Sequence, residues 1–259
     1  MEGAKADRDL IGSAAREAGC LALKFRERGL KHWEKSKGDP VSEADLAADH
    51  MLQERLKPAR PLYGWLSEES VDDQSRLNTV RSFVVDPIDG TRAFVKGRPE
   101  FVVSVAVVEN GNPIAAALYD PSSENLWDAA AGHGARLNGK AIKVSRQTRI
   151  SGSRLLGDPG KLADLRALGA EAHTVNSAAL RLALCAQGQY DALVAVRGKW
   201  DWDLAAGALI LTEAGGKITD WSGQSLVFNQ NPPRQPAPLA AGPELHSLLL
   251  DRLNDGAPS

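Results

Sequence analysis

The spacing of apolar residues along the chain changes from a helical period to a strand period and then alternates. Between residues 7 and 28, apolar side chains recur every three or four positions, which predicts a helix that Gly29 would stop. A second helix is predicted from Ser42 to about residue 56, before Pro58 and Pro61 open a loop. Apolar or alternating runs then predict strands at residues 82–85, 101–109, 113–119, 124–130 and 134–137.

The second half begins after a polar, Ser-, Arg- and Gly-rich stretch at residues 143–160, which we interpret as a boundary between two halves. Beyond it, the pattern predicts helices at residues 177–187 and 204–214, and strands at 192–196 and 217–219. Helices first, antiparallel strands next and helix–strand alternation last are typical of a layered α+β fold. We expect an N-terminal α+β half at residues 1–145 and a C-terminal α/β half at 146–259.

Composition narrows the class of protein without naming a function. The chain has 259 residues, with 31 basic and 33 acidic side chains and a net charge of −2. This balance lacks the positive charge expected of a protein that binds nucleic-acid polymers or anionic membranes. There is no run of about 18 apolar residues, no signal-peptide pattern and no Cys pair at metal-ligand spacing. These features predict a cytoplasmic protein.

The strongest chemical signal is Asp86-Pro87-Ile88-Asp89-Gly90-Thr91, directly after the apolar strand at residues 82–85. Pro87 cannot continue a central ladder, so we expect a turn that brings both carboxylates to one side. Gly90 permits close backbone approach, and Thr91 can begin a helix whose first N–H groups suit an anion. The pattern indicates hard cations beside a phosphate. The alternative is that Asp-Pro and Asp-Gly are ordinary turn dipeptides.

Two rival motifs do not fit this stretch. Haloacid-dehalogenase phosphatases use D-x-D-G-T, with a nucleophilic aspartate two residues before the second one. Here Pro87 holds that position and Asp86 lies one residue too early. A calcium loop of the form D-x-[DN]-x-[DN]-G is not present either.

Three further acidic signals are each modest alone. Asp203, in Trp202-Asp203-Leu204-Ala205-Ala206-Gly207, could simply cap a helix, and Glu68-Glu69 could be a solvated loop. Asp45 could belong to a capping box that starts at Ser42. Asp201 forms a competing Trp-Asp pair, but only Asp203 is followed by Leu-Ala-Ala-Gly.

Together, the order and spacing of these motifs resemble the inositol monophosphatase family of magnesium-dependent, lithium-sensitive phosphomonoesterases. The matching segments are the context of Asp45, the Glu pair at 68–69, the motif at 86–91, the Trp-Asp-x-x-x-Gly at 202–207, the Asn-Gly turn at 138–139 and Glu-Ala-Gly-Gly at 213–216. The resemblance covers about residues 40–221. It implies a layered α/β/α/β/α sandwich of the sugar-phosphatase type, with most metal ligands in the N-terminal half.

The resemblance also implies roles for individual residues. Two or three Mg²⁺ ions would be held by Glu68, Asp86, the carbonyl of Ile88, Asp89 and Asp203, and the phosphate would rest on the metals, Gly90 and Thr91. Thr91, hydrogen-bonded to Asp45, would orient the attacking water, with Glu68 counted among the catalytic groups. Ser177 and Arg181 would line the leaving group, although a helix arginine is as often simply solvated. Li⁺ is the expected inhibitor and a homodimer the expected assembly.

The substrate is less clearly indicated than the chemistry. We expect a small phosphorylated metabolite, with 3′(2′),5′-bisphosphate nucleotidase or inositol-1-monophosphatase activity ahead of histidinol-phosphate or sugar-phosphate phosphatase activity. Arg92-Ala93-Phe94 departs from the residues that both leading branches carry after Gly-Thr. A catalytically silent regulator is the non-enzyme alternative, but every acidic position of the motif set is filled.

Overall fold

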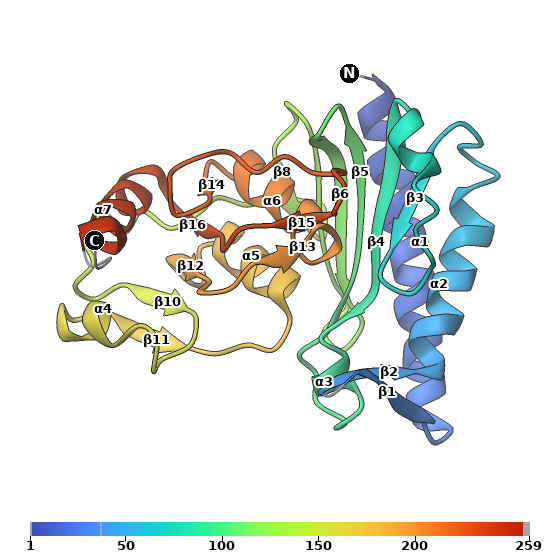
Figure 1. Cartoon of the computed structure of the whole chain (residues 1–259), viewed down its shortest axis with the longest axis horizontal. Helices are drawn as coiled ribbons and strands as arrows, with labels where there is room; N and C mark the ends of the chain where they lie inside the picture. Colours follow the sequence, from blue (N-terminus) through green and yellow to red (C-terminus); the bar gives the residue numbers. More distant parts are fainter. Residues whose placement is uncertain (1, 37, 256–259) are drawn as a thin grey trace.

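The computed structural model describes residues 2–36 and 38–255 and shows alternating layers of helix and sheet (Figure 1). The larger sheet has seven strands in the order β3-β4-β5-β6-β7-β8-β9. Only β3 and β4 pair in parallel; the other neighbours are antiparallel. Its strands are β3 (Gly64–Ser67), β4 (Arg81–Asp89), β5 (Val102–Glu109), β6 (Asn112–Asp120), β7 (Asn125–Ala130), β8 (Ala135–Leu137) and β9 (Lys140–Ala141).

Helices cover both faces of this sheet, which explains why β5 is apolar over most of its length. Val103, Val105 and Val107 pack in one core with α1 (Glu2–Glu27) and α2 (Glu43–Leu56). The alternate residues Val102 and Ala106 pack in another core with α5 (Ala178–Ala186) and α6 (Asp201–Glu213). Successive side chains of a strand point to opposite faces, so a sheet buried on both sides needs an unbroken apolar run.

A second sheet lies beyond α5 and α6 and has the order β11-β10-β12-β16-β14. Leu156, Leu193 and Ala240 face the core shared with α5 and α6, whereas Leu155 and Leu239 face another core. That outer core is closed by α4 (Ala163–Ala167) and α7 (Pro243–Asp255). The strands are β10 (Arg154–Leu156), β11 (Glu171–His173), β12 (Ala192–Val194), β14 (Lys217–Thr219) and β16 (Leu239–Ala241).

The layer order is therefore helix, sheet, helix, sheet, helix, and the predicted α/β/α/β/α class is confirmed. The polar stretch at residues 143–160 includes the connection from β9 to β10, between the two sheets. The division at residues 145 and 146 stays a prediction. No helix in residues 2–36 or 38–255 is both long and apolar enough to cross a membrane.

Small elements complete the fold near the edges of the sheets. A hairpin of two short strands follows α1, and a second two-stranded ribbon leads into α6. One 3₁₀ turn precedes β4 and one short helix follows it. These elements are β1 (His32–Ser36), β2 (Asp39–Ser42), β13 (Lys199–Trp200), β15 (Arg234–Gln235), η1 (Ser75–Asn78) and α3 (Thr91–Phe94).

Candidate active site

Strand β4 ends in two aspartates whose carboxylates lie on the same side. Asp86 pairs with Ser104 and Asp89 with Val102 on β5, so three steps along β4 match two along β5. Residues three apart in a regular strand point to opposite faces, and a bulge of this kind reverses the second one. The prediction of a turn at Pro87 is wrong. The strand continues to Asp89, and a bulge in it accommodates the proline.

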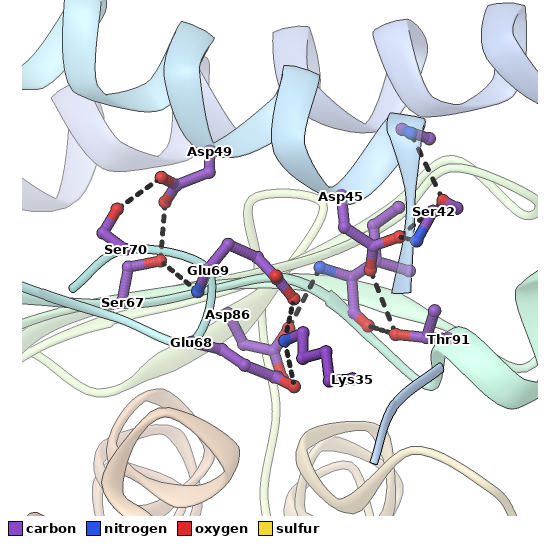
Figure 2. A network of polar contacts seen from close by, with 12 residues as sticks. Lys35, Ser42, Asp45, Asp49, Ser67, Glu68, Glu69, Ser70, Asp86 and Thr91 are labelled. Atoms are coloured by element: carbon purple, nitrogen blue, oxygen red, sulfur yellow. Dashed lines mark hydrogen bonds and ion pairs between the residues drawn. The ribbon is translucent and has the colours of Figure 1, made fainter. Parts of the chain in front are cut away.

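Two other elements bring carboxylates to the same place. Asp203 lies in the first turn of α6, and oxygens of Asp86, Asp89 and Asp203 all lie within 4.8 Å of one another. Glu68 follows β3, which runs parallel to β4, so both strands deliver their acids at the same edge of the sheet. Figure 2 shows the Glu68 side chain beside Asp86. The structure thus gathers the four acidic residues that the sequence singled out as metal ligands.

The site holds an excess of buried negative charge. Burial raises the pKa of Asp86 well above its usual range, and the carboxylates of Glu68, Asp89 and Asp203 raise it further. Burial also raises the pKa of Asp89, against the opposing effect of Lys199. Like charges held together disfavour joint ionisation unless a cation neutralises them. A donor set made only of oxygens fits a hard divalent cation such as Mg²⁺.

A lysine from the hairpin between α1 and α2 contacts this acidic group. The Nζ of Lys35 lies 2.6 Å from Glu69 and 3.3 Å from Glu68 (Figure 2). Burial lowers the pKa of Lys35, but the two carboxylates outweigh that effect and leave it raised. For Glu68, burial raises the pKa, Lys35 opposes it, and the net shift is upward. A positive charge is therefore held beside Glu68.

Thr91 and Asp45 form a hydrogen-bonded pair beside the acids. The Thr91 hydroxyl lies 3.1 Å from Asp45 Oδ1 and 2.9 Å from the Ile88 carbonyl, and it donates its one proton to this acceptor pair (Figure 2). Asp45 Oδ2 also accepts from the backbone N–H and hydroxyl of Ser42, as in a capping box. Burial raises the pKa of Asp45 in spite of these donors. Asp45 therefore both caps α2 and contacts Thr91.

Gly90 links β4 to α3 in a conformation that few other residues could adopt. Its φ is +107°, and an added Cβ would lie 2.6 Å from the Glu100 carbonyl oxygen. The backbone N–H groups of Ala93 and Phe94 both donate to the Gly90 carbonyl, at 2.8 and 3.0 Å, and close the single turn of α3. Gly90 and Thr91 line a pocket of about 210 Å³ together with Pro40, Glu68, Asp86, Ile88, Asp89, Arg92, Asn176, Lys199 and Asp203.

Residues 8–255 match the model of the inositol monophosphatase family. The chain belongs to this family. It is 35% identical over 221 residues to an inositol-1-monophosphatase of Rhizobium meliloti, covering 78% of this chain and 80% of that protein. It is also 35% identical over 231 residues to Nus factor SuhB of Escherichia coli K12, covering 81% and 83%.

Solved structures agree with the family at the level of the fold. The extragenic suppressor protein suhB of Bartonella henselae matches with a TM-score of 0.86 and 30% identity, over 97% of this chain and all of that one. An IMPase of Thermotoga maritima matches with a TM-score of 0.84 and 29% identity, over 95% and 96%. The relatives thus carry both inositol monophosphatase and SuhB names, and the family supports a phosphatase without fixing its substrate.

Ser177 and Arg181, the two residues of the second half that were predicted to bind substrate, lie in different places. Ser177 is fully buried, caps α5 and donates from Oγ to Asp89 Oδ2 at 2.6 Å. The backbone N–H of Ala179 donates to the same oxygen at 2.6 Å. Ser177 therefore positions Asp89 and is not among the residues that line the pocket, so its expected contact with substrate stays a prediction. Arg181 lies one turn further along α5, where it lines a neighbouring pocket.

The two aspartates of the Trp-Asp repeat have different partners. Asp201 is fully buried and accepts from the Asn229 backbone N–H at 2.6 Å and from Gln235 Nε2 at 2.7 Å. Asp203 accepts from the Trp200 backbone N–H at 3.1 Å and faces the other acids. Asp203 is therefore not the N-cap residue of α6, which is Trp200. It is the third residue of the helix, and it helps to cap the helix by accepting from the N-cap backbone.

Close packing of α5 against α6 requires a glycine at position 207, the last residue of the Trp-Asp-x-x-x-Gly motif. A Cβ at Gly207 would lie 2.6 Å from the Leu182 side chain, so α5 and α6 approach each other closely at this point. The spacing of these two helices matters for the site, because α5 anchors Asp89 and α6 carries Asp203.

Several pocket residues were missed by sequence reasoning. Lys35, Lys199 and Asn176 contact or line the site, yet no spacing pattern marks them. Strand β1, which carries Lys35, is exposed at each of its five positions, so it shows no alternation of buried and exposed residues. Tertiary contacts alone place these side chains at the acids.

Proposed function

We propose that this protein is a magnesium-dependent phosphomonoesterase that hydrolyses a small phosphate monoester without a covalent intermediate. The observation that carries the proposal is the meeting of Asp86, Asp89 and Asp203 within 4.8 Å, beside the hydrogen-bonded pair of Thr91 and Asp45. A buried acidic group of this kind has no packing benefit of its own, since like charges repel. Its presence is explained by a function that uses cations.

The residues divide into two candidate metal positions. Glu68, Asp86 and the carbonyl of Ile88 would hold one Mg²⁺, while Asp86, Asp89 and Asp203 would hold the other, with Asp86 shared. When bound, Mg²⁺ ions stabilise charge on the attacking and leaving oxygens and make water more acidic. Li⁺ is the inhibitor expected at the second position, as the resemblance to the family implies.

The chain itself supplies orientation. The N–H groups of Gly90 and Thr91 would bind phosphate oxygens, because both residues line the pocket at the acids. Thr91 Oγ1 donates its proton to the Asp45–Ile88 acceptor pair, so a lone pair is left to accept a hydrogen bond from water. A water held there is aimed by Thr91, and its proton can pass toward Asp45.

The leading substrates are a 3′(2′),5′-bisphosphate nucleotide and inositol 1-phosphate, followed by histidinol phosphate and sugar phosphates. Relatives named inositol-1-monophosphatase support the second of these. The rim of the pocket includes Arg92 and Lys199, which supports a leaving group that carries negative charge. The specificity constants of a panel of these esters at one Mg²⁺ concentration rank the candidates directly.

The decisive experiment compares the wild type with Asp86→Asn. We expect the wild type to release phosphate from at least one ester of the panel only when Mg²⁺ is present. The variant should keep the fold, because Asn retains the Oδ1 that accepts from the Ile88 N–H at 3.0 Å, and should lose Mg²⁺-dependent turnover. Near-normal turnover by the variant would falsify the metal assignment.

A regulatory role is the second candidate, because several relatives carry the name Nus factor SuhB. The complete acidic set favours retained catalysis in this chain. A folded wild type that releases no phosphate from any ester of the panel, with or without Mg²⁺, would favour the regulatory role.

A further inference from the structure

A fully buried arginine joins two segments that lie far apart in the sequence. Arg76 lies in η1, within the connection from β3 to β4 that begins with Glu68. Its partners include Asn229 and Gln230, in the segment between β14 and β15. Arg76 is not among the residues that line the pocket at the acids, so any part it plays there is indirect.

The guanidinium of Arg76 uses all of its N–H donors within the protein. Nε and Nη2 form a bidentate ion pair with Asp72, at 3.1 and 2.8 Å. Nη1 donates to the carbonyl and to Oδ1 of Asn229, at 3.1 and 2.7 Å, and Nη2 also donates to the Gln230 carbonyl at 3.0 Å. An arginine has five N–H donors, so these five contacts leave none for a ligand. Arg76 therefore holds protein segments together.

Asn229 connects Arg76 to the start of α6. Its φ is +61°, a left-handed conformation that asparagine tolerates better than most residues. In this conformation the Asn229 carbonyl accepts from Arg76, while its N–H donates to Asp201 Oδ2 at 2.6 Å. Its Nδ2 donates to Ser82 Oγ at 3.2 Å, near the start of β4. One residue thus contacts η1, β4 and α6.

The first turn of α6 is held by hydrogen bonds to Asp201, its first residue, and carries Asp203 as its third. Besides Asn229, Asp201 accepts from Gln235 Nε2 at 2.7 Å, and its own N–H donates to the Pro233 carbonyl at 3.0 Å. Apolar packing buries α6 along its length, but such contacts are not directional. The directional bonds to Asp201 therefore fix where the first turn, and with it Asp203, lies.

On its other side, Arg76 is fixed to the strands that carry the acids. Its carbonyl accepts from Thr79 Oγ1 at 2.8 Å. An added Cβ at Gly64 would lie 2.7 Å from the Arg76 Cα, so β3 packs directly against this residue, and β3 ends immediately before Glu68. A planar guanidinium held at every donor fixes the orientation of the groups it joins. The position of Asp203 relative to β3 and β4 hence depends on Arg76.

We propose that Arg76 is a positioning residue for Asp203, acting through the hydrogen bonds that join its loop to the first turn of α6. The proposal rests on the proposed function, because Asp203 is placed there as a metal ligand. Outer groups that orient metal ligands contribute about 10–100-fold in metal affinity. Loss of the Arg76 contacts should therefore weaken Mg²⁺ binding, while the groups that contact water and ester stay in place.

The test compares Mg²⁺ titrations of the wild type and of Arg76→Lys, followed by thermal unfolding and by phosphate release. Lysine keeps a positive charge beside Asp72 but cannot reproduce a planar fork of five donors. We expect the Mg²⁺ concentration for half-maximal turnover, and that for a given rise in Tm, both to increase about tenfold. The kcat at saturating Mg²⁺ should stay within about threefold of the wild type, because the loss is one of metal binding.

Asn229→Gly is a milder variant, and it decides the question if Arg76→Lys is too unstable to purify. Glycine adopts the same φ and keeps the backbone N–H that donates to Asp201, but the Oδ1 contact with Arg76 is lost. The Mg²⁺ requirement should rise by about threefold. In the double variant, the free-energy changes in Mg²⁺ binding should sum to less than additive, because both residues act through one link.

Arg81→Lys is the matched control. Arg81 is also an ion-paired arginine, with Glu109 at 2.6 Å and Asp7 at 3.3 Å, and it begins β4 at the opposite end from the acids. This variant should lower the Tm in chelator and leave the Mg²⁺ requirement unchanged.

An unchanged Mg²⁺ requirement in Arg76→Lys, or in Asn229→Gly if only that variant folds, would overturn the proposal, whatever the loss in Tm. An equal increase in Arg81→Lys would also overturn it, since weaker Mg²⁺ binding would then follow from lower stability alone. Strictly additive changes in the double variant would show that no shared link exists.

Failure of the proposed function is visible in the wild type alone. A folded wild type with no Mg²⁺ response in Tm or in turnover contradicts that function without any Arg76 variant. If Mg²⁺ raises the wild-type Tm but no ester is hydrolysed, the Tm titrations alone decide the role of Arg76.

Discussion

Removing one carboxylate from the acidic site should stabilise the metal-free protein while abolishing its response to Mg²⁺. Asp86 is the appropriate position because it lies between the two candidate metal positions and its carboxylate is buried among others. Asp86→Asn keeps the shape of the side chain and the oxygen that accepts from the Ile88 N–H. Only the negative charge is removed.

The size of the effect follows from the separation of the charges. At an effective dielectric constant of about 20, two unit charges 4.8 Å apart repel by about 3.5 kcal/mol. Protonation of one carboxyl relieves part of this repulsion, as the raised pKa of Asp86 indicates. We therefore expect a net stabilisation of about 2 kcal/mol, which corresponds to a rise in Tm of about 4–8 °C for a chain of this size.

The assay is thermal unfolding in the presence of a chelator and across a Mg²⁺ titration. A ligand at one hundred times its Kd stabilises the folded state by about 2.7 kcal/mol, so the wild-type Tm should rise clearly with Mg²⁺. The variant should start from a higher Tm and show no such rise. Asp120→Asn is the matched control, because Asp120 is also buried and accepts from a backbone N–H, that of Ser122, at 2.8 Å.

The control should not gain stability and should keep the Mg²⁺ response, since Asp120 ends β6 and is outside the acidic group. A lower Tm for Asp86→Asn in chelator would refute the repulsion argument. A Mg²⁺-dependent rise of wild-type size in that variant would refute the assignment of Asp86 as a shared ligand. The two results can be read separately from one set of melting curves.

Three further predictions concern single residues around the site and the second sheet. Thr91→Val should lower kcat by a factor of about 10²–10⁴ while the Mg²⁺-dependent rise in Tm is kept, because the hydroxyl that contacts Asp45 orients water and is outside the acidic trio. Asp203→Asn should abolish Mg²⁺-dependent turnover. Asp201→Asn should instead lower the free energy of unfolding by about 1–3 kcal/mol, because one of the two N–H donors to Asp201 loses its acceptor. The reverse pattern would exchange the roles of the two aspartates. His246 is fully buried, and burial lowers its pKa from 6.5 to about 4. The unfolded chain therefore binds a proton between pH 6.5 and 4 that the folded chain does not, so the wild-type free energy of unfolding should fall by up to about 3 kcal/mol as the pH drops through that window. Urea denaturation at pH 7 and pH 4.5 should show a smaller fall for His246→Gln.

Local patterns predicted the elements that bury a periodic apolar face. The helix at residues 42–56 corresponds to α2 (Glu43–Leu56), with Ser42 as its cap, and the Asn-Gly turn at 110–111 joins β5 to β6. In each case the signal lies within a few residues of the structure it specifies. The acidic residues were recognisable only together, because the order of their motifs resembles the inositol monophosphatase family, whereas each motif alone had an ordinary structural explanation.

The rest depended on contacts between distant segments. The hairpin that carries Lys35 is exposed along β1, so no buried face marks it in the sequence. Strands β10, β11 and β16 were not predicted, and their places are set by partners distant in the sequence: β10 pairs with β11 and β12, and β16 pairs with β12 and β14. Pro87 predicted a turn, but the bulge at the β4–β5 pair is a property of two strands and cannot be read from one.

The arrangement of layers connects catalysis to selectivity. The larger sheet supplies Asp86 and Asp89, but the α5–α6 layer completes the site, because Ala179 anchors Asp89 and Asp203 stands at the start of α6. That same layer carries Arg181, which lines the neighbouring pocket at the ends of β10, β11 and β12. The loops after β10 and β12 line that pocket, so changes in them can alter which leaving group is preferred while the acids stay fixed on the larger sheet and α6.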